Sequence, residues 1–80
     1  MVTEKLKGVI LQALHLEDYE IDDSTTAGMV PGWDSLSHVR VILAIEEAYN
    51  IRFRTLEVIR LKNVGELQAL VDRKNPPSAN

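Results

Sequence analysis

The stretch Gly32-Trp33-Asp34-Ser35-Leu36 combines a carboxylate and a hydroxyl where a loop is expected to give way to a helix. Asp34 is a good N-cap residue, and Ser35 would then take the first helical position, beside amides with no acceptor in the helix. The partial positive charge at a helix N-terminus favours anions, so a phosphate esterified to Ser35 would be stabilised there. Asp-Ser pairs also start helices without further function, and both interpretations stay open on these residues alone.

His38 lies three residues after Ser35, so the two side chains share a helix face and a Ser-His hydrolase has to be considered. A serine nucleophile also needs an oxyanion pocket and a group that orients the histidine, and the chain has no G-x-S-x-G turn. We therefore expect no catalytic residue, and we expect His38 to be exposed or to face a partner.

From Glu17 to Asp23, five of seven residues are acidic. The run lacks the alternating ligands and the turn glycine of a calcium-binding loop. We predict a solvated acidic loop and no metal site.

The chain has 80 residues, no Cys and a net charge of −3, with 45% apolar and 26% charged residues. A chain of this length forms one domain with a thin core, so an enclosed active site is not expected. The absence of Cys excludes disulfides and thiolate chemistry and fits the cytoplasm. Negative charge disfavours nucleic-acid binding, and the longest apolar run, Val41 to Ile45, is too short for membrane insertion.

Apolar residues recurring at intervals of three and four predict four helices that position these groups. Their expected caps and ends are Thr3 to about Leu16, Asp34 to Asn50, Thr55 to Arg60, and Asn63 to a stop at Asn75-Pro76-Pro77. The pattern indicates an all-α fold, a four-helix bundle with three longer helices and one short one.

Residues 17–33 connect the first two helices as one long loop that is rich in turn-forming residues. Loops of this length in compact domains are uncommon and tend to be functional or disordered. We expect Ile21, Met29 and Val30 to pin the loop onto the core. We expect one domain, residues 1–75, and a short disordered tail, residues 76–80.

The triplet Asp34-Ser35-Leu36, opening a helix after a long acidic loop in a four-helix chain, resembles the acyl carrier protein family. The similarity extends from Val2 to about Val71. It implies that Ser35 carries a 4′-phosphopantetheine arm through a phosphodiester, attached by a phosphopantetheinyl transferase that uses coenzyme A and magnesium. Asp34 would help that transferase to bind its metal.

The same resemblance implies a non-catalytic, monomeric carrier. The thiol of the arm would hold an acyl or aminoacyl group as a thioester. A loading enzyme would supply that group, and a downstream transferase or synthase of lipid, polyketide or related secondary-metabolite synthesis would receive it.

The family also implies a partner surface on the second helix. Its expected residues are Leu36, Val39, Arg40, Leu43, Glu46 and Glu47, whereas Ile42, Ile45 and Tyr49 correspond to core positions. Carriers of fatty-acid synthesis usually have an acidic second helix that docks on basic enzyme patches. Ser37 and Arg40 stand where acids are usual, and residues 40–80 have a net charge of +2 against −5 for residues 1–39. We therefore expect a specialised carrier.

An alternative in another class is a small helical adaptor that is never modified. It would bind a partner helix through the surface formed by Leu36, Val39 and Leu43. For that interpretation, the hydroxyl of Ser35 would have no role.

Overall fold

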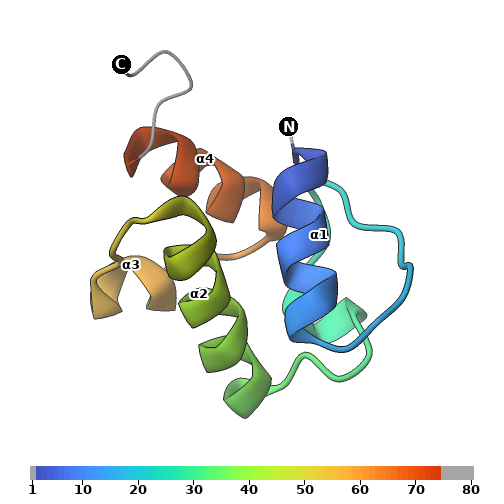
Figure 1. The fold of residues 1–80 in the computed structure, drawn as a ribbon. Coiled ribbons are helices and arrows are strands. Elements are labelled where there is room, and N and C mark those ends of the chain that lie inside the picture. Colours follow the sequence, from blue (N-terminus) through green and yellow to red (C-terminus); the bar gives the residue numbers. More distant parts are fainter. Residues whose placement is uncertain (1, 75–80) are drawn as a thin grey trace.

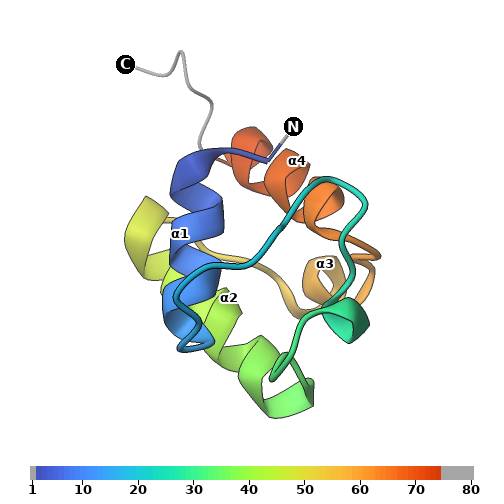
Figure 2. The ribbon, with the colours of Figure 1, turned by 90° about the vertical axis from the view of Figure 1, so that its right-hand side faces the viewer.

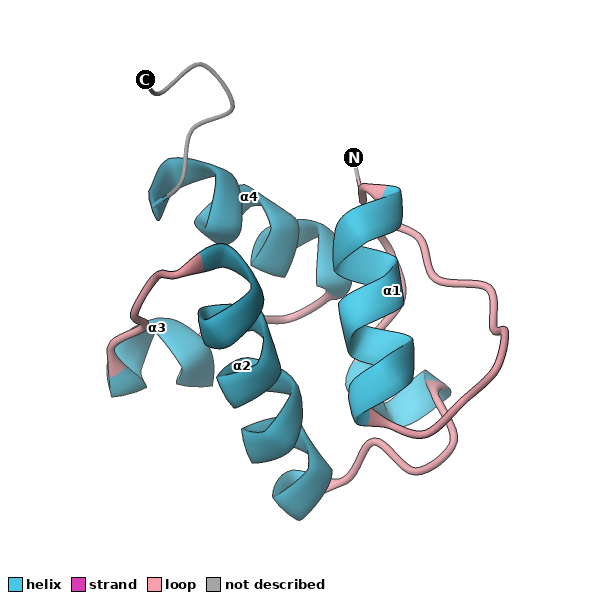
Figure 3. Ribbon diagram, viewed as in Figure 1, coloured by secondary structure: helices cyan, strands magenta, loops and turns pink. Residues whose placement is uncertain are grey.

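The structure, a computed structural model, describes residues 2–74. Within that range it has four α-helices, α1 (Glu4–Ala13), α2 (Ser35–Tyr49), α3 (Thr55–Ile59) and α4 (Val64–Lys74), and one 3-10 turn, η1 (Ala27–Met29). Figure 3 shows helices and loops and no strand among the described residues. The all-α, four-helix prediction is confirmed. The expected helix stop at Asn75-Pro76-Pro77 and the tail, residues 76–80, lie outside the described residues.

The helices enclose one apolar core. α1 and α2 run in opposite directions and pack against each other, and α4 crosses behind them (Figure 1). The fully or almost fully buried side chains come from α1, α2, α4 and the long loop: Leu6, Ile10, Leu11, Leu14, Ile21, Val30, Trp33, Val41, Ile42, Ile45, Val64, Leu67, Leu70 and Val71. No residue of α3 is among them, so this short helix covers the core from outside.

Three of the four described helices begin where the sequence predicts. Three predicted caps accept backbone N–H groups of the first turns: Thr3 from Leu6 (3.2 Å), Asp34 from Ser37 (2.8 Å) and Asn63 from Glu66 (2.8 Å). Thr55 was expected as the cap of α3 and is instead its first residue. The carboxylate of Glu57 reaches back one turn, and its Oε1 accepts the Arg54 N–H at 2.8 Å. Arg54 is therefore the cap, and the helix begins one residue earlier than expected.

The long loop before α2 is fixed to the start of α4. It leaves the far end of α1, crosses to α4 and returns through η1 to α2 (Figure 2). The carbonyl of Asp23 accepts the Gly65 N–H at 3.0 Å, and the carbonyl of Thr25 accepts the Val64 N–H at 2.8 Å. The loop thus supplies acceptors for amides that a helix N-terminus leaves without partners.

Two of the three residues expected to pin the loop do so. Ile21 and Val30 are buried, but Met29 is 60% exposed, so that prediction was wrong. Met29 closes η1, and its carbonyl accepts the Tyr19 hydroxyl at 3.0 Å. Adjacent residues point to different sides of the chain, and here Val30 takes the core side.

Trp33 anchors the end of the loop to α2. Its indole is 7% exposed, and its Nε1–H donates to His38 Nδ1 at 3.0 Å. The two rings stack with centroids 6.0 Å apart. His38 is therefore half-buried and engaged within the fold, so the expectation that it is exposed was wrong, whereas the expectation that it faces a partner stays a prediction. Because Nδ1 accepts, this histidine is neutral with its proton on Nε2.

Replacing Gly65 with alanine should destabilise the protein. A Cβ at this position would lie 2.8 Å from the Asp23 carbonyl oxygen and 2.9 Å from Asp23 Cβ, so the loop backbone would have to move. We expect chemical denaturation to show a loss of about 1–3 kcal/mol for Gly65→Ala. Gly8→Ala is the matched control: it meets no atom within 4 Å in α1, and it should stabilise by about 0.5–1 kcal/mol. Equal stability of the two variants would contradict the close contact.

Stability should also fall on mild acidification. Burial lowers the pKa of His38 below its ordinary value of 6.5. The unfolded chain then binds a proton more readily than the folded one, so the free energy of unfolding decreases as the pH falls through the unfolded pKa. Denaturation curves followed by the fluorescence of Trp33 at about pH 7.5 and about pH 5.5 should show this loss. His38→Gln should flatten the difference, whereas the exposed His15→Gln should leave it unchanged.

Candidate functional site

Ser35 is presented to solvent between two fixed points. Before it, Gly32 has a φ of +80°, a left-handed conformation that favours glycine, and the buried Trp33 follows directly. After it, the chain continues as α2. The Ser35 side chain is exposed, as expected for a residue in the first turn of that helix. Its hydroxyl is thus open to another molecule while its backbone is held.

Asp34 places a negative charge beside this hydroxyl. Hydrogen bonds from the Ser37 backbone and side chain, and from the Leu36 backbone, hold the pKa of the Asp34 carboxyl below its ordinary value of 3.8. The carboxylate is therefore ionised at neutral pH, and it is exposed. Asp34 therefore caps α2 and keeps a free negative charge beside Ser35, and carboxylate oxygens are ligands that Mg²⁺ prefers.

A mostly apolar groove of about 220 Å³ lies between α2 and α3. Its lining comes from α2, the connection after it and α3: His38, Val39, Ile42, Leu43, Phe53, Arg54, Thr55, Val58 and Ile59. His38 is one turn from Ser35, so the groove begins close to the hydroxyl. Sequence reasoning identified Val39 and Leu43 but missed Phe53, Val58 and Ile59. In the stretch Ile51-Arg52-Phe53-Arg54, apolar residues alternate with arginines, and this pattern could have predicted that Phe53 faces the protein.

The predicted partner residues on α2 are exposed with one exception. Leu36, Val39 and Leu43 are 69%, 54% and 57% exposed, and Arg40 and Glu47 are exposed as well. Glu46 is half-buried, and its Oε2 accepts the Phe53 N–H at 2.7 Å, so it stabilises the connection to α3. The predicted core residues Ile42 and Ile45 are buried. Tyr49 is half-buried, and Lys5 Nζ lies over its ring, 4.4 Å from the ring centroid.

Other chemistry receives no support from the described residues. His38 Nδ1 is occupied by Trp33, and no hydrogen bond joins His38 to Ser35 within residues 2–74. In that range no group of three or more His, Cys, Asp or Glu side chains is arranged to hold a metal ion, the acidic loop included. No helix in the described part of the chain has the length and apolar character needed to cross a membrane.

Comparison with known proteins agrees with the fold. No protein-family model matches the chain. Among solved structures, it is similar to a holo acyl carrier protein from Geobacter metallireducens, with 37% sequence identity and a TM-score of 0.83. The match covers 89% of this chain and 82% of the other. Since identity and fold agree over most of both chains, this protein belongs to the acyl carrier protein family.

Proposed function

We propose that this protein is a cytoplasmic, monomeric carrier that is modified on Ser35 with 4′-phosphopantetheine and presents a bound acyl or aminoacyl group to partner enzymes. The observation that carries the proposal is the exposed Ser35 hydroxyl at the first residue of α2, held beside the ionised Asp34 and the α2–α3 groove. The cargo would serve lipid, polyketide or related secondary-metabolite synthesis.

The residues present fit such a group. The Ser35 hydroxyl is exposed, so a transferase has access to it, and the helix N-terminus favours the phosphodiester charge by about 0.3–1 kcal/mol. In the modification, Ser35 Oγ would form a bond to the phosphorus of coenzyme A that bears the pantetheine. The anhydride bond from that phosphorus would break, releasing adenosine 3′,5′-bisphosphate, and the hydroxyl proton would pass to solvent. When bound, the group supplies a thiol on a flexible arm, which holds cargo as a thioester and which a chain without Cys lacks.

Asp34 would have two roles at this site. Its carboxylate caps α2, which fixes the position of Ser35, and its free charge would support the Mg²⁺ ion of the transferase. Leu36, Val39 and Leu43 would contact the transferase, the loading enzyme and the downstream transferase or synthase, because they remain exposed next to Ser35.

The alternative, an unmodified helical adaptor, relies on the same exposed residues, Leu36, Val39 and Leu43. One substitution distinguishes the adaptor function from the carrier function. Ser35→Ala leaves the biological activity of an adaptor intact and abolishes that of a carrier.

Ser35 should be the only residue modified by a phosphopantetheinyl transferase. We expect incubation with coenzyme A, Mg²⁺ and a transferase of broad specificity to add one phosphopantetheinyl group, measured by intact mass spectrometry. Ser35→Ala should abolish the gain. Ser24→Ala, in the loop before α2, is the control for an exposed serine away from the site and should be modified like the natural chain. A gain in mass that is retained in the Ser35→Ala variant would contradict the proposal.

Asp34→Asn should separate capping from metal support. Asparagine caps helices about as well as aspartate, so the free energy of unfolding should change by less than about 1 kcal/mol. Loss of the charge should slow modification of Ser35 by about tenfold or more, as for other groups that support a metal site. The rate of mass gain and a denaturation curve measure the two effects. An unchanged rate would remove Asp34 from the transferase reaction.

A further inference from the structure

The imidazole of His38 carries a hydrogen-bond donor that the fold leaves without an acceptor. Its Nδ1 accepts the Trp33 Nε1–H at 3.0 Å, so the ring proton is on Nε2. No residue of the range 2–74 accepts a hydrogen bond from this Nε2–H. In the same range no buried side-chain nitrogen or oxygen lacks a partner, and His38 is half-buried. The Nε2 atom must therefore lie at the accessible surface of a cavity that His38 lines.

His38 lines two cavities. One is the α2–α3 groove of about 220 Å³, and the other has a volume of about 60 Å³ and lies between the loop, α2 and the start of α4. Trp33 lines the small cavity but is not among the described residues that line the groove. The two nitrogens lie on different sides of an imidazole ring, so a ring that turns Nδ1 toward Trp33 turns Nε2 away from it. This geometry favours the groove as the position of the Nε2–H donor.

The rest of the groove lining is mostly apolar and contains no carboxylate. Arg54 and Thr55 are its other polar residues, and none of the residues 2–74 that line it is Asp or Glu. Imidazole Nε2–H and guanidinium groups donate hydrogen bonds, whereas the Thr55 hydroxyl can donate or accept. A ligand that complements this lining has an apolar chain and an oxygen acceptor. An ammonium group is disfavoured, because it only donates and because the charge of Arg54 repels it.

We propose that the groove takes acyl groups that bear an oxygen on the chain, such as 3-hydroxyacyl groups, and that His38 selects them by donating its Nε2–H to that oxygen. The inference rests on the proposed function, because the arm on Ser35 would bring the cargo to the groove. It assigns the cargo to one chemical class. The groove volume is below the range of about 300–1,000 Å³ for sites of drug-sized ligands, so the chain that it takes is short.

Saturated acyl and aminoacyl groups fit this lining less well. A saturated chain would cover the Nε2–H and remove its water without supplying an acceptor, and a donor left unpaired in this way rejects the ligand. The ring cannot turn this donor out of the groove without breaking the bond from Trp33 to Nδ1. An aminoacyl group would place an ammonium against a lining that mainly donates.

Three cargoes of equal chain length test this selection on the arm of Ser35. A transferase of broad specificity loads the chain from coenzyme A analogues that carry hexanoyl, 3-hydroxyhexanoyl or 2-aminohexanoyl groups through an amide, which resists hydrolysis. Intact mass confirms loading. Nuclear Overhauser effects from the terminal methyl of the cargo to the methyl groups of Val39, Leu43 and Val58 measure how much cargo lies in the groove. We expect the ratio of bound to free cargo to be about threefold to tenfold higher for 3-hydroxyhexanoyl than for either other group, because one hydrogen bond contributes about that factor.

Matched substitutions locate the donor. His38→Phe keeps an aromatic ring without a donor, and it should lower the ratio for 3-hydroxyhexanoyl to that for hexanoyl. His38→Gln should retain most of the preference, because the amide oxygen can accept from Trp33 while the amide nitrogen donates. His15→Phe, at an exposed histidine outside the groove, is the control and should retain all of it. If His38→Phe does not fold, Trp33→Phe combined with His38→Phe replaces it, since this pair leaves no indole donor without a partner.

Equal ratios for the three cargoes, or a higher ratio for hexanoyl or 2-aminohexanoyl, would overturn the inference. An equal loss of preference with His15→Phe and His38→Phe would overturn it as well. In these cases the gain in mass still shows that Ser35 carries the arm, so the proposed function stands. Absence of any gain in mass would instead contradict the proposed function, and the inference with it.

Discussion

The buried indole of Trp33 fixes the point at which the long loop becomes α2. An aromatic side chain buries a large area, and in a core this small such burial contributes about 1.5–3 kcal/mol. The bond from its Nε1–H to His38 Nδ1, 3.0 Å long, joins the residue two before Ser35 to the residue three after it. The hydroxyl of this acyl carrier protein is therefore held from both sides, although nothing covers it.

Polar contacts hold the opposite end of the molecule. Gln68 is 1% exposed; its Oε1 accepts the Thr3 N–H at 2.9 Å, and its Nε2 donates to Asp72 Oδ1 at 2.9 Å. The carbonyls of Asp23 and Thr25 accept the first amides of α4 on the same side. These bonds tie α1, the loop and α4 together without using α2 or α3. As a result, the exposed side chains of α2 and α3 are left for binding, although His38, which lines the groove, also holds the end of the loop through Trp33.

The predictable features of this protein are local ones. Caps such as Asp34 depend on a side chain and amides within the same turn, and the helices follow from the spacing of apolar residues. The errors concern contacts across the chain or the choice between neighbours. Of the neighbours Met29 and Val30, only Val30 is buried in the core. The hydrogen bond between Trp33 and His38 joins a loop to a helix, and the spacing of apolar residues does not predict such a contact. The groove forms only where α3 packs beside α2, and the sequence does not show how the two helices are arranged. Its lining residues were therefore predicted only on α2.

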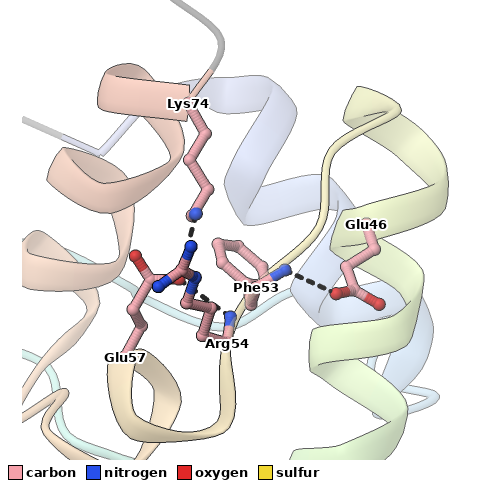
Figure 4. Close-up of polar contacts among 5 residues, drawn as sticks. All are labelled: Glu46, Phe53, Arg54, Glu57 and Lys74. Carbon is pink, nitrogen blue, oxygen red and sulfur yellow. Dashed lines mark hydrogen bonds and ion pairs between the residues drawn. The ribbon is translucent and has the colours of Figure 1, made fainter.

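The charge of a surface differs from the sum of its ionisable residues. By sequence, Glu46 counts as a docking acid, yet its carboxylate accepts the amide of Phe53 and keeps the connection to α3 in position. Glu57 similarly begins α3 and pairs with Lys74. The fold thus uses carboxylates to satisfy backbone amides, a task that guanidinium groups cannot perform because they have no acceptor. Accepting a backbone amide fixes the position of a carboxylate and leaves its charge, as at Glu46, whereas an ion pair such as that of Glu57 with Lys74 compensates the charge of both groups (Figure 4).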